Sequence, residues 1–271
     1  MDYDVYPWSV RKRIYERDGV EILQTTSPSW VLKLQTSRYV TPRELRFLQK
    51  VCDEGPSVRN MVELPPEPER RFGDNWYAMR RYAGSVHTYP TAAWRRLGCD
   101  VLNFLEDLHR GHSSLHMDIV TRNILAAEDG RFVVSDYELL VKMPGDNEPA
   151  VACDCEDTLW YYIGAGAELT EPLHAWRMDL NMLGYCLAEL TWGDDEPTFP
   201  RLCQRRRQDT RMDMSGYDII KRRDEEMQQC HPVVRAYLDR VAALVPWRAT
   251  EPPAAAVYDE LRALLQRDHP V

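Results

Sequence analysis

One stretch decides the fold: His116-Met117-Asp118-Ile119-Val120-Thr121-Arg122-Asn123-Ile124-Leu125, followed shortly by Val134-Ser135-Asp136-Tyr137-Glu138. Two apolar runs, residues 123–127 and 131–134, are separated by Glu128-Asp129-Gly130. Asp-Gly between two such runs is a strong hairpin signal. The sequence therefore predicts a hairpin that places Asn123 and Asp136 at the open ends of paired strands.

The order Asp118, Asn123, Asp136 matches what phosphoryl transfer from ATP requires. Asp118 is predicted to orient a substrate hydroxyl as catalytic base, while Asn123 and Asp136 are predicted to hold Mg²⁺ ions that neutralise phosphate charge. Each short match alone is compatible with loop carboxylates that satisfy backbone donors in turns. Found in order around one hairpin, they favour an ATP-dependent phosphotransferase.

Composition sets the class of protein. The 271 residues are 44% hydrophobic, enough for one large domain or two lobes. A net charge of −9 argues against broad nucleic-acid binding, which needs a basic field. No run approaches the roughly 18 apolar residues of a membrane span, and the N-terminal residues do not resemble a signal peptide. We expect a cytoplasmic protein that binds neither membrane nor nucleic acid directly.

The seven cysteines are scattered, which favours reduced thiols. Cys153 and Cys155 form a close pair, but a zinc site needs further ligands at suitable spacing. We interpret that segment as a loop.

The residues before the motif predict strands near 5–8, 13–15, 20–23 and 30–34. Lys33 interrupts the last of these, and Val-Leu-Lys is similar to the Val-Ala-Ile-Lys pattern of a phosphate-anchoring lysine. A lysine in a strand is also compatible with a solvated edge position. A glycine-rich nucleotide loop should precede it, and Gly19 is the glycine present there.

A helix is predicted to begin at Thr41-Pro42-Arg43-Glu44, with Leu45, Leu48 and Val51 on its apolar face. Glu44 has two interpretations, which local sequence leaves open. It could close a capping box with Thr41, or it could pair with Lys33.

Downstream, a strand is predicted near 60–62 and another at 76–79, with 80–84 as its exit. Three further helices are predicted from apolar spacing: one capped by Thr91, one from Asp179 to Gly193, and one over 255–266. The acidic stretch 137–160 is expected to be a functional loop.

Four segments resemble the vaccinia-related kinases, a family of casein-kinase-like Ser/Thr protein kinases. The most specific is Arg-Met-Asp-Leu-Asn-Met-Leu-Gly-Tyr-Cys at 177–186, similar to the family's Arg-Gly-Asp-Leu-Glu-x-Leu-Gly-Tyr-Cys. Residues 43–47, 157–160 and 251–265 support it. The resemblance spans essentially the whole chain and is to divergent members of the poxvirus type.

This resemblance implies an α+β, bilobal protein-kinase fold. Residues 1–79 would form a small β-rich N-lobe with helix C, residues 80–84 the hinge, and residues 85–271 a larger, mainly α-helical C-lobe. The implied activity is transfer of the γ-phosphate of ATP to Ser or Thr of host or viral proteins in the host cytoplasm. Family members phosphorylate, among others, the barrier-to-autointegration factor, which makes that protein a candidate partner.

By position in the family pattern, Lys33 would hold the α- and β-phosphates and Glu44 would orient it. Asp179 would brace the catalytic loop, and residues 137–160 would be the activation segment. The sequence departs from the family pattern at the glycine-rich loop, at Val120 in place of a lysine, and at Glu138 in place of a glycine.

These departures keep two alternatives open. The first is a pseudokinase that acts as a binding or scaffold protein. The second is a small-molecule phosphotransferase, a class that shares His-x-Asp-x-x-x-x-Asn and often follows the metal-binding Asp with an aromatic and an acidic residue. The long segment 137–160 and the match at 177–186 oppose this second alternative.

Overall fold

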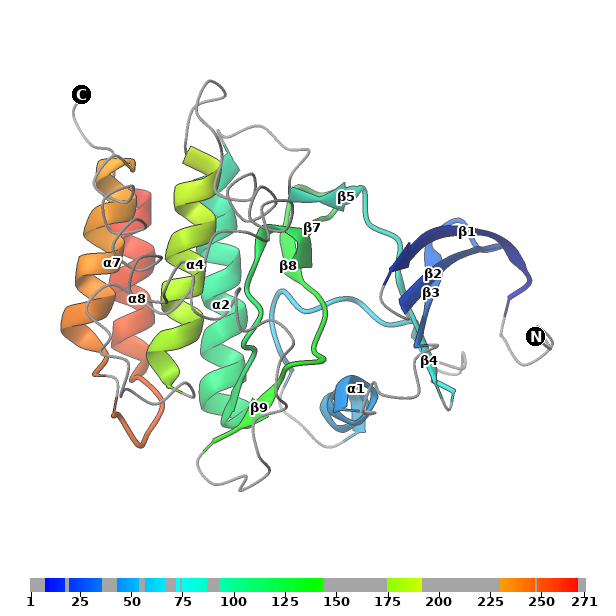
Figure 1. Ribbon diagram of the computed structural model, residues 1–271, viewed down its shortest axis with the longest axis horizontal. Helices are drawn as coiled ribbons and strands as arrows, with labels where there is room; N and C mark the ends of the chain where they lie inside the picture. Colours follow the sequence, from blue (N-terminus) through cyan, green and yellow to red (C-terminus); the bar gives the residue numbers. More distant parts are fainter. Residues whose placement is uncertain are drawn as a thin grey trace, which may run out of the picture.

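The structure is a computed structural model with mixed α+β character. It describes residues 8–17, 20–35, 43–53, 57–66, 72–73, 75–86, 93–143, 175–191, 230–246 and 248–267. In these ranges an antiparallel sheet and helix α1 (Arg43–Asp53) lie on one side of the molecule. Four helices lie side by side on the other: α2 (Trp94–His112), α4 (Trp176–Thr191), α7 (Pro232–Leu244) and α8 (Ala255–Gln266) (Figure 1).

The sheet has the strand order β1-β2-β3-β4, with every neighbouring pair antiparallel. Its strands are β1 (Val10–Arg17), β2 (Val20–Thr25), β3 (Trp30–Gln35) and β4 (Trp76–Arg80). The four predicted strands 13–15, 20–23, 30–34 and 76–79 all fall within them, whereas most of the segment expected at 5–8 lies outside the described residues.

Strand periodicity divides β3 between two apolar environments. Leu32 and Leu34 pack on one face against Trp76 and Ala78, whereas Val31 faces the main hydrophobic core. Because successive side chains alternate between faces, Lys33 lies on the same face as Val31. The register pairs Lys33 with Tyr77 of β4, which belongs to the main core. The lysine is therefore directed into the protein and not to a solvated edge.

Helix α1 (Arg43–Asp53) covers that face and buries the predicted apolar positions. Leu45, Leu48 and Val51 are all buried, and Glu44 is fully buried beside them. Thr41, its expected cap, lies outside the described residues. The helix thus brings a carboxylate into an apolar interior, where it needs partners.

The predicted hairpin forms between β7 (Ile124–Ala126) and β8 (Phe132–Val134), with Ile124 paired to Val134. Gly130 closes it at φ 80°, a conformation that glycine adopts without steric cost. β5 (Gly84–Ser85) adds to β7, and β6 (Ser114–Leu115) pairs with β9 (Val141–Lys142). The strand expected near 60–62 is a single bridge between Met61 and Val134.

The remaining helices are α2 (Trp94–His112), α4 (Trp176–Thr191), α7 (Pro232–Leu244) and α8 (Ala255–Gln266). The bounds predicted for α8 are confirmed. The start predicted for α4 at Asp179 is wrong, because the helix already begins at Trp176. The N-cap of α2 is Ala93, not Thr91.

Helix α7 was not predicted from the sequence. It begins at a capped turn in which the side chain of His231 accepts a hydrogen bond from the Val233 N–H and Pro232 occupies the first turn. Val234, Tyr237 and other apolar side chains then bury one face of the helix.

One large hydrophobic core connects β3, β4 and α1 with α2, α4, α7 and α8. Among the described residues, no helix has the length and apolar composition needed to cross a membrane.

Close packing of α4 against α7 makes Gly184 a sensitive position. A Cβ there would lie 2.3 Å from Leu238 Cδ2 and 2.8 Å from its Cγ. Overpacking of this kind costs about 1–3 kcal/mol, against a gain of about 1 kcal/mol in helix propensity. We expect Gly184→Ala to lower the denaturant midpoint. Gly111→Ala, at an exposed position of α2, is the control and should raise it; equal shifts in the two variants would contradict the packing argument.

Candidate functional site

The ammonium group of Lys33 is the centre of a buried charge cluster. Its Nζ lies 2.9 and 3.1 Å from the two carboxylate oxygens of Glu44 and 3.0 Å from Asp136 Oδ1. A third carboxylate, Glu138 Oε1, lies 3.7 Å away. Burial lowers the pKa of Lys33, but the three carboxylates outweigh it and raise the pKa, so the ammonium stays charged.

Glu44 uses its carboxylate to join three elements. Oε1 accepts hydrogen bonds from the Tyr77 hydroxyl of β4 at 2.9 Å and from the backbone N–H of Tyr137 at 3.1 Å, in addition to Lys33. These partners satisfy a carboxylate whose side chain is 0% exposed. Of its two interpretations, the structure contains the ion pair with Lys33; the proposed capping partner Thr41 lies outside the described residues.

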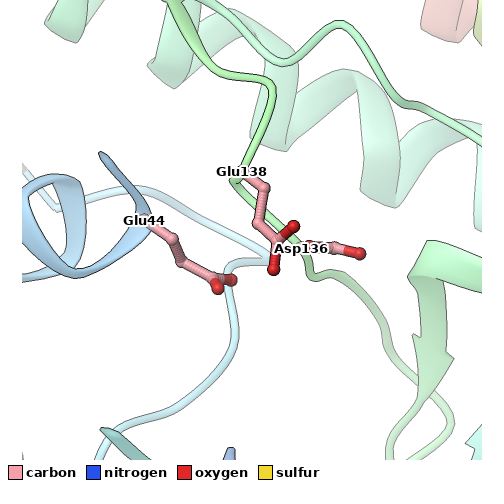
Figure 2. A group of neighbouring side chains, drawn as sticks. All are labelled: Glu44, Asp136 and Glu138. Carbon is pink, nitrogen blue, oxygen red and sulfur yellow. The ribbon is translucent and has the colours of Figure 1, made fainter. Parts of the chain in front are cut away.

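Asp136 and Glu138 follow β8 on the same short segment, whereas Glu44 comes from α1 (Figure 2). Oxygens of the three carboxylates all lie within 4.8 Å of one another. Such a cluster is not by itself a metal site, because the cation of Lys33 contacts all three. By formal charge, the three carboxylates exceed the one ammonium by two negative charges. The cluster therefore favours a further cation and disfavours an unaccompanied anion.

Asp136 adopts a strained backbone conformation, with φ 69°. Met117, directly before Asp118, has φ 67°. Each such residue costs about 1–3 kcal/mol and persists only where its surroundings determine it. Asn60 and Ser113 also have positive φ, so two of the four such non-glycine residues in the described part of the chain lie at or beside the aspartates that the sequence singled out.

Asp118 is held by two neighbours of its own loop, in which the short 3₁₀ helix η4 covers Thr121–Asn123. Asn123 Nδ2 donates to Asp118 Oδ2 at 2.7 Å and to its backbone carbonyl at 3.0 Å. Arg122 Nη2 lies 3.2 Å from both carboxylate oxygens. Burial raises the pKa of Asp118, Arg122 opposes the rise, and the charge of Asp136 adds to it. Asp118 and Asp136 are thus close enough to influence each other.

The two groups are also connected through the backbone. The N–H and the hydroxyl of Ser135 both donate to the Asn123 carbonyl, at 2.8 and 3.0 Å. Since Ser135 directly precedes Asp136, this contact fixes the position of Asn123 relative to Asp136. The hairpin accordingly brings the two predicted metal ligands to neighbouring positions.

Asp179 of α4 holds the backbone of the loop that carries Asp118. Its oxygens accept the backbone N–H groups of His116 at 2.7 Å and Met117 at 2.8 Å. Oδ2 also contacts His109 Nε2 at 3.0 Å, and His109 Nδ1 lies 2.7 Å from the Tyr258 hydroxyl of α8. Met117, which donates one of these hydrogen bonds, has its left-handed conformation directly before Asp118.

A second set of contacts joins the loop to the last turns of α4. The Thr121 hydroxyl donates to Glu189, with both carboxylate oxygens at 3.2 Å, and Cys186 Sγ donates to the Ile119 carbonyl. Burial raises the pKa of Glu189 to about 7, while the Thr121 hydrogen bond and the charge of Arg122 oppose the rise. Helix α4 therefore supports the loop on both sides of Asp118.

Residues 80–84 begin with two arginines, and the contacts of the first, Arg80, explain its presence there. Its guanidinium donates to Glu63 Oε2 at 2.7 Å, and Arg131 donates to the other oxygen at 2.9 Å. The backbone N–H groups of Arg80 and Arg81 donate to the Glu63 and Ser29 carbonyls. These contacts fix the exit of β4, while the Arg81 side chain is exposed.

The residues present fit Mg²⁺, which prefers oxygen ligands. Because Asn123 commits Nδ2 to Asp118, its Oδ1 is the atom suited to ligate a cation. Asp136 engages Lys33 through Oδ1, and its side chain remains 36% exposed. Both predicted ligands could thus present oxygen to a metal while keeping the contacts described above.

The structure brings together Lys33, Glu44, Asp118, Asn123 and Asp136. Gly19, the remaining predicted nucleotide-binding residue, lies outside the described residues, as do residues 144–160 of the expected activation segment and the Cys153–Cys155 pair. Sequence reasoning missed Arg122, Tyr77, His109 and Glu189 as members of the site. Their spacing carries no distinguishing signal, although Arg122 stands inside the motif itself.

No protein-family model matches the chain, and a search of curated proteins finds no match. Function is therefore inferred from the residues of the site.

Asp179 gives a test of how the loop is held. Burial raises its pKa, but hydrogen bonding to His109 and to backbone N–H groups outweighs this and lowers the pKa. Its stabilisation is therefore present above the unfolded pKa, ~3.9, and is lost as pH falls through the lower folded value. We expect Asp179→Ala to lower the free energy of unfolding by about 3–5 kcal/mol at pH 7, and by less at pH 3.

Urea unfolding of both proteins at the two pH values measures this difference. Asp129→Asn is the matched control, because hydrogen bonds from Arg131 also lower the pKa of Asp129, but on the surface. Its unfolding midpoint should match that of the wild type. An Asp179→Ala deficit that is unchanged at pH 3 would contradict the assigned pKa direction.

Proposed function

We propose that the protein is a divergent Ser/Thr protein kinase with the bilobal kinase fold, using ATP and Mg²⁺. The observation that carries this proposal is the convergence on Lys33 of Glu44 from α1 and Asp136 from beyond β8, next to an Asp118–Asn123 pair. An anchoring lysine, its glutamate, a hydroxyl-orienting aspartate and two metal ligands are the parts that phosphoryl transfer needs. In this proposal residues 1–79 form the N-lobe, residues 80–84 the hinge and residues 85–271 the C-lobe.

Each residue has a role set by its contacts. Lys33, held by Glu44, presents its ammonium to the α- and β-phosphates. Asp118 accepts a hydrogen bond from the substrate hydroxyl and orients it toward the γ-phosphate. Asn123 and Asp136 hold Mg²⁺, which when bound neutralises charge on the phosphate oxygens. Because Asn123 also donates a hydrogen bond to Asp118, its amide group would help to position both the metal and the substrate hydroxyl.

A second candidate, a pseudokinase that acts through binding, is favoured by Glu138. Its carboxylate stands 3.7 Å from the ammonium that would receive the phosphates. A negative charge there competes with nucleotide for Lys33. The excess negative charge of the carboxylates around Lys33 means that nucleotide would need Mg²⁺ in order to bind. In the kinase Mg²⁺ overcomes the competition between Glu138 and nucleotide for Lys33, and in the pseudokinase it does not.

For substrate and partner, the proposal follows the resemblance to vaccinia-related kinases of the poxvirus type. The substrate would be a host or viral protein in the host cytoplasm, and the barrier-to-autointegration factor is the first to test. Phosphate incorporation into that protein, a generic Ser/Thr peptide and an aminoglycoside would separate a protein kinase from a small-molecule phosphotransferase.

The direct test is nucleotide binding followed by transfer. We expect Mg-ATP to bind weakly, ATP without Mg²⁺ not to bind, and phosphate transfer to a protein substrate to be slow. Asp118→Asn should reduce transfer by several powers of ten while Mg-ATP binding and the unfolding midpoint stay near wild type. Calorimetry and radiolabel incorporation measure the two steps. Absence of Mg-ATP binding at millimolar nucleotide would reject the kinase and leave the pseudokinase, and Mg-ATP binding without transfer to any substrate would also count against catalysis.

Glu138 provides a separate prediction. Glu138→Gln keeps the shape of the side chain and removes its charge, so Mg-ATP affinity should rise about tenfold, equivalent to ~1.4 kcal/mol. Some ATP binding without Mg²⁺ should also appear. Glu128→Gln makes the same charge change at an exposed position of the β7–β8 turn and is the control. If both variants bind like the wild type, Glu138 does not compete for Lys33.

A further inference from the structure

The kinase pattern places a lysine two residues after the catalytic Asp, but this chain has Val120 at that position. The Val120 side chain is 3% exposed and packs in the main hydrophobic core. A lysine there would have to bury its charge or leave the core. Any positive charge that assists transfer must therefore come from another residue.

Arg122 is the residue that places a cation on Asp118. Its Nη2 lies 3.2 Å from each Asp118 carboxylate oxygen. The arginine side chain is 50% exposed, whereas that of Asp118 is 13% exposed. The guanidinium thus approaches the carboxylate from the solvent side, the side from which a protein substrate must also approach.

The remaining contacts of Asp118 define where a hydroxyl can bind. Oδ2 accepts the short hydrogen bond from Asn123 at 2.7 Å. Arg122 is equally close to both oxygens, so Oδ1, which the Asn123 side chain does not contact, is the oxygen suited to a substrate hydroxyl. A hydroxyl bound there lies about 3 Å from the carboxylate, with the reacting phosphorus about 3–3.5 Å farther on. A guanidinium next to Oδ1 can therefore reach that phosphoryl group by a change of side-chain rotamer alone.

We propose that Arg122 is a catalytic residue that transfers its contact from Asp118 to the γ-phosphoryl oxygens as the substrate hydroxyl binds. In the step, the hydroxyl oxygen forms a bond to the γ-phosphorus as the bond to the β–γ bridging oxygen breaks. The bridging oxygen leaves on ADP with the electron pair, and the hydroxyl proton passes to Asp118. Arg122 stabilises the negative charge on the transferring group, as a planar guanidinium does well. This inference rests on the proposed kinase function.

The alternative is an ordinary surface ion pair of small energetic effect. A catalytic Arg122 and an ordinary surface ion pair predict different effects when the charge of Arg122 is removed. Removing a surface pair leaves the catalytic rate unchanged. Removing a catalytic arginine lowers the rate, while the hydrogen bonds that Asn123 donates to Asp118 stay in place.

Arg122→Gln, Arg122→Lys and Arg240→Gln form the test set. Arg240 pairs with Glu260 at 2.6 Å, and its side chain is 42% exposed against 50% for Arg122, so the two arginines have similar exposure and each contacts a carboxylate. It belongs to α7, away from the β7–β8 hairpin (Figure 1). We expect Arg122→Gln to lower kcat by about 10²–10³-fold with the KM for Mg-ATP nearly unchanged. Arg122→Lys should recover part of this loss, and Arg240→Gln should match the wild type.

A second measurement does not need turnover. Mg-ADP affinity is measured with a serine peptide, with and without aluminium fluoride as a mimic of the transferring phosphoryl group. Mg-ADP alone should bind the wild type, Arg240→Gln and Arg122→Gln with equal affinity. Aluminium fluoride should increase the Mg-ADP affinity of the wild type and of Arg240→Gln, and should increase that of Arg122→Gln much less. Equal strengthening in all three proteins, or an unchanged kcat, would overturn the role of Arg122. A wild type that binds no Mg-nucleotide at all would instead reject the proposed kinase and, with it, this role.

Discussion

The ion pairs of the Lys33 ammonium with Glu44 and Asp136 are the interaction on which the arrangement of the site depends. They join the sheet, helix α1 and the segment beyond β8, three parts of the chain far apart in sequence. A buried ammonium is costly unless its partners are close and themselves satisfied. Glu44 meets this condition through Tyr77 and the Tyr137 backbone. Displacing α1 or the segment at Asp136 would take a close partner from the buried ammonium, so the position of each element is tied to the others.

Much of this geometry was predictable because the relevant signals are local. Period-two alternation directs Lys33 away from Leu32 and Leu34 and into the core. The Asp-Gly turn fixes the β7–β8 hairpin, and that hairpin places Asn123 beside the segment bearing Asp136. The apolar spacing of residues 255–266 identifies α8 to the residue. In each case a short window of sequence contains both the pattern and its physical reason.

The parts that were missed depend on contacts between distant segments. Helix α7 owes its start to His231 and Pro232, a capping arrangement without the usual Ser, Thr or Asp signal. Nothing near Glu189 in the sequence indicates that it meets Thr121. Arg122 was visible inside the motif, yet its direction toward Asp118 depends on how η4 turns. The explanation of Arg80 likewise needed Glu63 and Arg131 from two other segments. In irregular backbone, the direction of a side chain is set by contacts with distant parts of the chain. A short window of sequence carries no information about those contacts.

The distribution of charge connects these observations. The site has two aspartates that influence each other, and each is given its own cation: Lys33 for Asp136 and Arg122 for Asp118. In the proposed kinase this separation would let the two carboxylates take different roles, Asp136 toward a metal and Asp118 toward a substrate hydroxyl. Glu138 adds negative charge on the Lys33 side only. On the Asp118 side, Asp179 holds the loop through the backbone N–H groups of His116 and Met117. In the proposed kinase, the departures from the family pattern would therefore act on different steps, Glu138 on the affinity for nucleotide and Val120, with Arg122 nearby, on the transfer itself.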